Sequence, residues 1–267
     1  MEQVETARIV APQWAQRRRR TAQLLARWPH AEEMLRLYEA LLDTQERAFL
    51  TALDARPSPR DLAAYVVERV IADVVDDTVA AGPAALAEAA RERFLAGGLD
   101  VAVQHWLDAG SQSAVDEYLA RAASAPVLEA LGPAAGEACR PASPPGGCPR
   151  CGGRPQLSYL PESGEALVTS PRRLLCGRCH GDWVHERMTC PACGERSTDK
   201  LSIHADAEGL PHLRAEACES CHRYLIAVDL RREPAAVPVV DELAALPIDL
   251  YMRERGFTKI APNLMGV

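Results

Sequence analysis

Apolar residues in the first half of the chain recur at helical spacing. Over residues 31–53 they return every three or four positions, as on one face of an α-helix. Ser58 as N-cap with Pro59 in the first turn predicts a further helix that runs to about Ala81. Shorter periodic segments lie between breakers at 13–27, 83–96, 100–108 and 112–123, with a short turn at 126–131. Residues 1–138 are therefore predicted to form an α-helical domain.

The pattern changes after residue 131. Residues 132–147 are rich in Gly, Pro and Ala and predict a linker, of which 139–147 separates two domains. An amphipathic helix is expected near the C-terminus over 239–255, disturbed at Pro247. Between them, short apolar runs predict strands at 157–159, 166–169, 201–204 and 224–228. These strands would form the small hairpins from which metal-binding turns project.

Eight of the nine cysteines form four Cys-x-x-Cys pairs. Adding one constant number to the positions of the first two pairs gives the positions of the last two, so that Cys148 corresponds to Cys190. Two such turns complete a tetrahedral sulfur shell around one ion. Because a duplicated unit should carry a complete site, we expect consecutive pairing. Site 1 then consists of Cys148, Cys151, Cys176 and Cys179, and site 2 of Cys190, Cys193, Cys218 and Cys221. The two modules are placed at 148–187 and 188–232, followed by a C-terminal helical segment at 233–267.

The residues alone leave the metal open, because four thiolates suit zinc or iron equally. His180 and His222 complete Cys-x-x-Cys-His sequences, which also match a c-type haem attachment signature. Each of these sequences has a partner pair upstream at a fixed distance, which disfavours haem and leaves both histidines outside the ligand shell. Cys139 has no Cys-x-x-Cys partner and is expected to be a free thiol rather than a ligand.

Charge narrows the function classes. The net charge of −7 comes from residues 1–138, which carry 14 basic and 21 acidic side chains, whereas residues 139–267 carry 16 of each. This balance argues against a nucleic-acid binder, which normally shows a basic face. We see no signal peptide and no apolar stretch of membrane-spanning length, so we expect a cytoplasmic protein with metal thiolates rather than disulfides. No catalytic constellation stands out, and we expect no enzyme.

Three regions resemble the formate dehydrogenase accessory proteins of the FdhE family. The first is WPHAEEMLRLYEALLDTQ at 28–45, similar to an early helix of that family. The second is the set of four Cys-x-x-Cys pairs, beginning CPRCGGRP and CPACGE. The third is DELAALPIDLYMRERGFTKIAPNLMG at 241–266, close to the family's terminal segment. Together they span nearly the whole chain in the same order.

The resemblance implies a cytoplasmic maturation factor that binds the catalytic subunit of a formate dehydrogenase during assembly. It also implies an α+β multidomain fold, with an N-terminal α-helical domain, two tandem rubredoxin-like or zinc-ribbon-like modules and a C-terminal helix. Iron is the implied metal, held by all eight paired cysteines. Two other interpretations stay open at this point, a zinc-ribbon protein that binds nucleic acid and a rubredoxin-like electron carrier.

Overall fold

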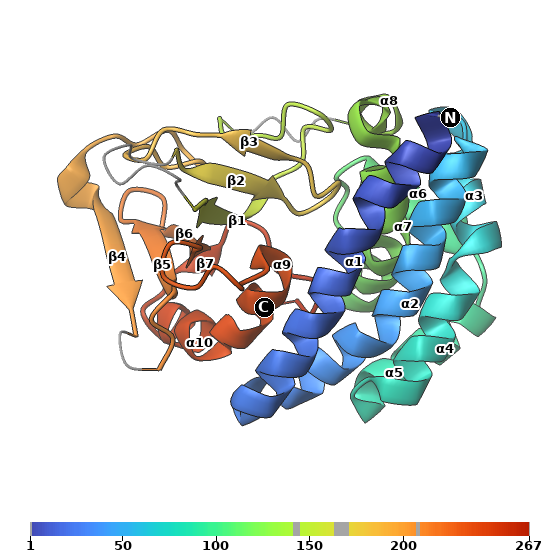
Figure 1. Cartoon of the computed structure of the whole chain (residues 1–267), viewed down its shortest axis with the longest axis horizontal. Helices are drawn as coiled ribbons and strands as arrows, with labels where there is room; N and C mark the ends of the chain where they lie inside the picture. The colour runs from blue at the N-terminus through green and yellow to red at the C-terminus, as the bar shows by residue number, and fades with distance from the viewer. Residues whose placement is uncertain (1, 141–144, 163–170, 207–208, 267) are drawn as a thin grey trace. The chain divides into compact units, whose positions relative to one another are not determined.

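The computed structural model describes residues 2–140, 145–162, 171–206 and 209–266 (Figure 1). The chain divides into two compact units, Met1–Arg140 and Pro141–Val267. The first unit is helical and the second contains a mixed sheet, so the fold class predicted from the sequence is confirmed. None of the helices within the described residues has the length and apolar character needed to cross a bilayer.

Helices α1 to α8 build the first unit. Ser58 and Ser113 act as helix N-caps, since their hydroxyls accept hydrogen bonds from the backbone N–H groups of Arg60 and Asp116 at 3.3 and 3.2 Å. The bounds are α1 Glu2–Arg27, α2 Glu32–Ala55, α3 Leu62–Arg69, α4 Ile71–Ala81, α5 Ala84–Leu95, α6 Leu99–Leu107, α7 Ala114–Leu131 and α8 Ala135–Ala138. Single 3₁₀ turns at Pro29–Ala31, Pro59–Asp61 and Gly132–Ala134 join some of them.

The core of this unit forms where α2 packs on α1, α4 and α7. Trp14 of α1 meets Phe49 of α2 edge-on, with ring centroids 5.9 Å apart. Some polar side chains in this core have hydrogen-bond partners. The Gln45 side-chain amide donates to the Ala122 carbonyl at 3.1 Å, and the Thr78 and Tyr118 hydroxyls lie 2.7 Å apart. The amphipathic pattern of the sequence therefore identified the correct faces.

Three helical predictions need correction. The helix expected from Ser58 to Ala81 is broken at Val70, whose φ of −131° ends α3 before α4 begins. Helix α7 does not end at residue 123 but continues through Pro126 to Leu131. Residues 118–128 are all buried, so packing outweighs the hydrogen bond that proline removes. Residues 132–138, expected to be a linker, form a 3₁₀ turn and α8.

One sheet runs through the whole second unit in the order β3-β2-β1-β6-β5-β4. Its strands are β1 Pro155–Leu160, β2 Arg173–Cys176, β3 Asp182–Val184, β4 Leu201–Ala205, β5 Leu213–Cys218 and β6 Arg223–Asp229, with β7 Thr258–Lys259 beside β6. Neighbours within each module are antiparallel, whereas β1 and β6 are parallel, with Leu157 opposite Ile226. The two modules are therefore not separate hairpins but halves of a continuous sheet.

Three of the predicted strands fall within β1, β4 and β6, and the fourth, at 166–169, lies outside the described residues. Strands β2, β3, β5 and β7 were not predicted. The second copy of the module nevertheless follows the first, because the offset that relates the cysteines also carries β2 onto the end of β5 and β3 onto the start of β6.

The C-terminal segment is not the single amphipathic helix that we expected. It consists of α9 Pro238–Asp241, a 3₁₀ turn at Glu242–Ala245 and α10 Leu246–Glu254, with Pro247 in the first turn of α10. Its acidic residues Asp241, Glu242 and Asp249 point inward and are buried. A single helix with a polar outer face cannot place these three side chains inside, which explains the difference.

These buried acids hold the segment to the sheet of its own unit. Asp241 pairs with His212 at 2.8 Å, and the Lys259 ammonium lies 2.8 Å from Glu242 and 3.2 Å from Asp249. The Tyr224 hydroxyl donates to Asp249 at 2.8 Å. Burial raises the pKa of Glu242, although Lys259 and a hydrogen bond from Gln156 act in the opposite direction. The segment is therefore a built-in part of the second unit.

Candidate metal centres

Each Cys-x-x-Cys pair forms a tight turn that ends in left-handed backbone. Gly152 and Gly194 follow the first pair of each module with φ of 68° and 81°, and their N–H groups donate to the carbonyls of Cys148 and Cys190 at 2.9 Å. The second pair of each module is followed by histidine instead, and His180 and His222 have φ of 51° and 52°. The Cys-x-x-Cys-His sequences thus place histidine where the turn requires a positive φ, a conformation that glycine adopts at no steric cost.

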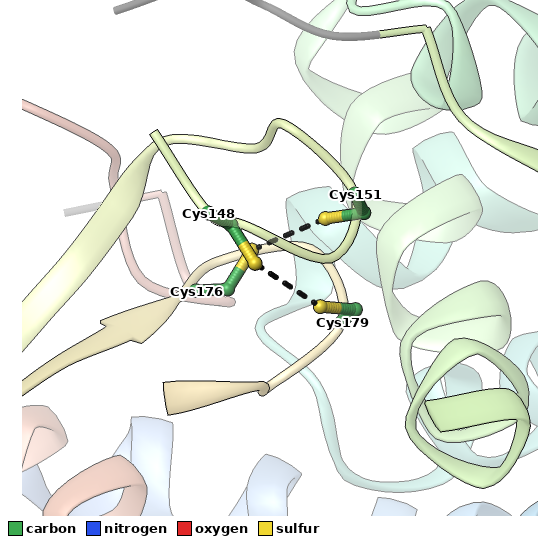
Figure 2. Close-up of side chains that lie close together, drawn as sticks. All are labelled: Cys148, Cys151, Cys176 and Cys179. Carbon is green, nitrogen blue, oxygen red and sulfur yellow. Dashed lines mark hydrogen bonds between the residues drawn. The ribbon is translucent and has the colours of Figure 1, made fainter. Parts of the chain in front are cut away.

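The four sulfurs of site 1 converge between the turns (Figure 2). Cys148 Sγ lies 3.7 Å from Cys179 Sγ, and Cys151 Sγ lies 3.5 Å from Cys176 Sγ. All four sulfurs lie within 4.8 Å of one another. A tetrahedral shell with metal–sulfur bonds of about 2.3 Å has edges of about 3.8 Å, so the arrangement fits one metal ion.

Site 2 repeats this geometry. Cys190 Sγ lies 3.8 Å from Cys221 Sγ, and Cys193 Sγ lies 3.7 Å from Cys218 Sγ. Among the residues that the structure describes, the only groups of His, Cys, Asp or Glu that could hold a metal are these two. The structure brings the eight cysteines together in the two sets that the duplication predicts, and Cys139 lies outside both. Their role as metal ligands stays a prediction.

The donor set limits the metal. Four sulfurs suit zinc or iron, whereas magnesium and calcium take oxygen ligands. Backbone N–H groups support the sulfur atoms, since Arg150 N donates to Cys148 Sγ at 3.4 Å and Arg178 N to Cys176 Sγ at 3.3 Å. Contact with Cys151 acts to raise the pKa of Cys148, but hydrogen bonds with Cys176 and Cys179 lower that pKa to about 7. The neighbouring thiols therefore favour the thiolate at Cys148, the form that binds metal, whereas contacts with Cys148 and Cys151 raise the pKa values of Cys176 and Cys179.

Site 1 is covered by its own module. All four of its cysteines are buried. Gly153 lies so close that a Cβ atom there would meet Cys176 Sγ at 2.9 Å and the Arg178 side chain at 3.2 Å. Arg178 is itself buried, and its guanidinium donates to the carbonyl of Cys151 at 3.2 Å. The absence of a side chain at Gly153 therefore leaves room for Arg178 to pack beside Cys151 and Cys176.

Site 2 lacks this cover. The repeat offset carries Gly153 onto Glu195 and Arg178 onto Ser220. Ser220 is exposed and its hydroxyl donates to the Glu195 carboxylate at 2.6 Å. That bond, with the N–H groups of Ser197 and Arg196, lowers the pKa of Glu195 to about 2. Cys193 is exposed and Cys221 is half-buried, so two sulfurs of this site are open to solvent.

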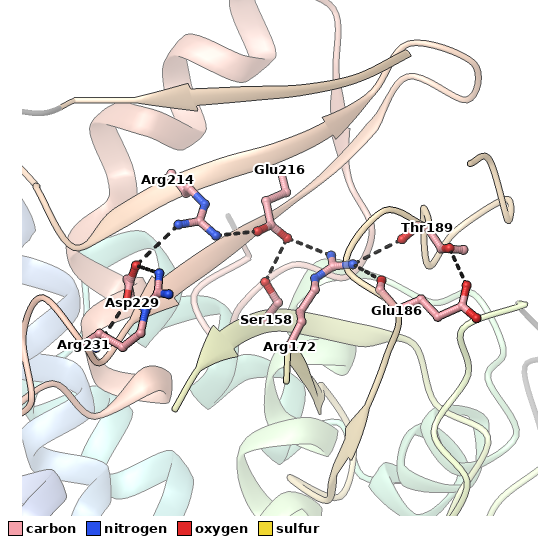
Figure 3. A network of polar contacts seen from close by, with 8 residues as sticks. All are labelled: Ser158, Arg172, Glu186, Thr189, Arg214, Glu216, Asp229 and Arg231. Carbon is pink, nitrogen blue, oxygen red and sulfur yellow. Dashed lines mark hydrogen bonds and ion pairs between the residues drawn. The ribbon is translucent and has the colours of Figure 1, made fainter. Parts of the chain in front are cut away.

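A network of charged side chains links the two modules (Figure 3). Arg172, just before β2, pairs with Glu216 of β5 at 2.8 Å and donates to the Thr189 carbonyl beside site 2 at 3.1 Å. The Ser158 hydroxyl of β1 donates to the same Glu216 at 3.1 Å. Arg214, which the repeat makes equivalent to Arg172, contacts Glu216 from the other side at 2.9 Å. These residues were not predicted from the sequence, although the repeat offset places the two arginines at equivalent positions of the two modules.

The fold and the cysteine groups define a class of protein, in which a helical unit precedes a sheet unit with two four-cysteine groups that could hold metal. The profile of the family described as "FdhE, C-terminal domain" matches residues 188–265, which include site 2 and the C-terminal segment. The FdhE homologue of Aquifex aeolicus is 33% identical over 119 residues, which are 45% of this chain and 41% of the relative. That of Pseudomonas aeruginosa is 30% identical over 184 residues, 67% of this chain and 51% of the relative.

The crystal structure of the FdhE protein from Pseudomonas aeruginosa has the same fold, with a TM-score of 0.67, 24% identity and coverage of 94% of both chains. The family model and the curated homologues support the assignment of this chain to the FdhE family. In sequence it spans about half or less of the length of the curated relatives that it matches.

Proposed function

We propose that this chain is a cytoplasmic, non-enzymatic accessory factor that is required for formate dehydrogenase activity and binds the catalytic subunit during assembly. The observation that carries the proposal is the family match over residues 188–265, because it covers a cysteine group together with the C-terminal segment that is bonded to the same sheet. Spacing of cysteines alone is shared by many metal-binding modules.

We further propose that the eight paired cysteines bind two metal ions, iron as the resemblance implies or zinc. When bound, each ion ties two turns of one module together, which a sheet with short outer strands requires. The chain's own residues do the rest. Left-handed residues shape the turns, and Arg172 with Glu216 fixes one module against the other. In this proposal the metal centres brace a surface for the partner and carry out no reaction.

The proposal is tested by anaerobic co-expression of the tagged full chain with the formate dehydrogenase catalytic subunit. Co-purification of the subunit, and loss of dehydrogenase activity in a strain without this chain, are the expected results. Full activity in that strain together with no co-purification would contradict the proposal. Elemental analysis and a visible spectrum of the protein purified without oxygen identify the metal independently of the partner.

The variant Cys190→Ala/Cys193→Ala connects the two parts of the proposal. We expect it to lose one metal ion and the capacity to support maturation. A matched control is Cys139→Ala, which removes the one cysteine outside both groups and should leave metal content and maturation unchanged. If the double variant loses metal but still supports maturation, site 2 is dispensable for the accessory role.

A further inference from the structure

The two cysteine groups have the same ligands but opposite access to solvent. In site 1 all four cysteines are buried, whereas in site 2 Cys193 is exposed and Cys221 is half-buried. The neighbours follow the same division. Arg178 is 5% exposed, whereas its equivalent Ser220 is exposed to solvent. The two sites therefore differ in the solvent exposure of their cysteines and also of the residues beside those cysteines.

We propose that site 2 is a metal-exchange site, at which thiol-bearing or chelating molecules reach the ion and take it up or deliver it, while site 1 keeps its ion permanently. This inference rests on the proposed metal ligation and is independent of the formate dehydrogenase partner. The ligand is a soft divalent cation, zinc or ferrous iron, because the donor set is four sulfurs.

Three substitutions between the copies open site 2. At Glu195 a side chain points outward to Ser220, where Gly153 in site 1 leaves room for Arg178. Ser220 is short and exposed, whereas Arg178 is buried and bonded to the Cys151 carbonyl. In site 1 the Arg150 side chain packs against Gly181. In site 2 the repeat places Arg223 at the position of Gly181 and the small Ala192 at the position of Arg150. The positions of Arg150 and Arg178 therefore carry no arginine in the second copy.

The chemistry of exchange is simple ligand replacement. With an ion bound, the sulfur of an incoming thiol would replace the Cys193 sulfur as a ligand, and Cys193 would take up the proton that the incoming thiol gives up. No electrons are transferred, so no oxidant or reductant is required. At site 1 the same approach is hindered, because all four cysteines are buried and the buried Arg178 lies beside Gly153, next to Cys151 and Cys176.

Acidic side chains stand at the open site. The Glu195 carboxylate accepts hydrogen bonds from the Ser220 hydroxyl and from the backbone N–H groups of Ser197 and Arg196. Glu219, at the Gly177 position of site 1, is exposed and accepts from the Ser202 hydroxyl at 2.9 Å. Negative charge beside the exposed Cys193 and the half-buried Cys221 attracts a cation, which suits a site where metal enters and leaves.

The test uses the full chain loaded with two equivalents of zinc and the chromogenic chelator pyridylazoresorcinol. We expect one equivalent of zinc to be released at least about tenfold faster than the other, the scale on which outer contacts change metal affinity. Alkylation with N-ethylmaleimide during the fast phase, read by peptide mass spectrometry, should modify Cys193 and Cys221 while Cys148 and Cys176 stay protected. This footprint needs no variant.

Two matched variants complete the test. Glu195→Gly/Ser220→Arg gives site 2 the cover of site 1 and should slow the fast phase, whereas Arg178→Ser should speed up the slow phase. Release of both ions at one rate, or alkylation of site 1 first, would overturn the inference while leaving the two metal sites intact. Binding of fewer than two zinc ions would overturn the metal ligation itself, and the exchange inference with it.

Discussion

The two copies of the cysteine module keep their ligands and differ in what surrounds them. The eight sulfurs adopt nearly the same distances, 3.5 to 3.8 Å between the closest pairs, in both sites. The cover differs, because Gly153 and Arg178 close site 1 and Glu195 and Ser220 leave site 2 open. Geometry of a metal site and access to it are thus set by separate residues, and a duplication can preserve the first while it changes the second.

The largest effect should come from removing one ligand of each site. Structural zinc contributes on the order of 10 kcal/mol to the folding of small modules, and Cys176 is fully buried. Cys176→Ala is therefore expected to lose one metal ion and to unfold the first module. Cys193→Ala should also lose one ion but shift the thermal midpoint less, since Cys193 is exposed. Elemental analysis and thermal unfolding measure both. A larger shift of the thermal midpoint for Cys193→Ala than for Cys176→Ala would contradict the proposed difference between the two sites.

The next effect concerns Arg172, which is buried and pairs with Glu216 across the modules. Arg172→Met leaves Glu216 with Arg214 and the Ser158 hydroxyl. It is expected to cost about 3 kcal/mol, because hydrogen bonds to charged groups contribute about 1.5–3 kcal/mol each. Denaturant unfolding gives the free energy, and hydrogen exchange in β1 and β5 gives the location.

The matched control is Arg214→Met, at the equivalent position of the second copy. Its side chain is 23% exposed, against 4% for Arg172, so water already weakens the ion pair that this substitution removes. We expect a smaller loss of stability from this substitution. Equal losses would show that the two arginines do the same work despite their different burial.

Exchanging the covers should have an intermediate effect. A side chain at Gly153 would meet Cys176 Sγ at 2.9 Å, and overpacking of this kind costs about 1–3 kcal/mol. Gly153→Glu should therefore lower the stability of the first module in denaturant titrations. The reverse change, Glu195→Gly, removes hydrogen bonds at the surface and is expected to cost less. Tolerance of Gly153→Glu would mean that site 1 is less tightly closed than its contacts indicate.

The smallest effect should be found at the histidines that follow the second turns. His222 has φ of 52°, so a β-branched residue is strained there by about 1–2 kcal/mol. His222→Val should show this loss in thermal unfolding. His222→Asn should not, because asparagine tolerates left-handed backbone. Metal content should be unchanged in both variants, and a loss of metal in His222→Asn would assign the ring a role in the site.

The sequence predicted the cysteine groups because a single offset relates all eight positions. It did not predict β5, where Leu213, Ala215 and Ala217 face inward, since small alanines weaken an alternating pattern. It also failed for the C-terminal segment. The inward direction of Glu242 depends on Lys259 and Gln156, which lie on distant strands. Local patterns report which residues are apolar, not which acids will find a buried partner.

The residues that cover site 1 could not be predicted from the sequence for a related reason. Arg178 is a long cationic side chain between two cysteines, and such residues are mostly exposed. Its burial follows from the missing side chain at Gly153, just after the preceding Cys-x-x-Cys turn. A position-by-position comparison of the two copies shows that Gly153 and Arg178 are both replaced in the second copy, which indicates a difference between the two sites. Only the structure shows that these two changes meet in space.

The parallel pairing of β1 with β6 has a consequence for how the chain folds during synthesis. Leu157 and Ile226 are partners in this pairing, although most of both modules lies between them in the sequence. Contacts between such distant parts of a chain form late, and a chain emerging from the ribosome folds from its N-terminus. Until β6 has been made, β1 presents an open edge that other chains can pair with. Completion of the second module therefore protects the first, and a chain that stops before residue 229 is expected to aggregate rather than to yield a stable half.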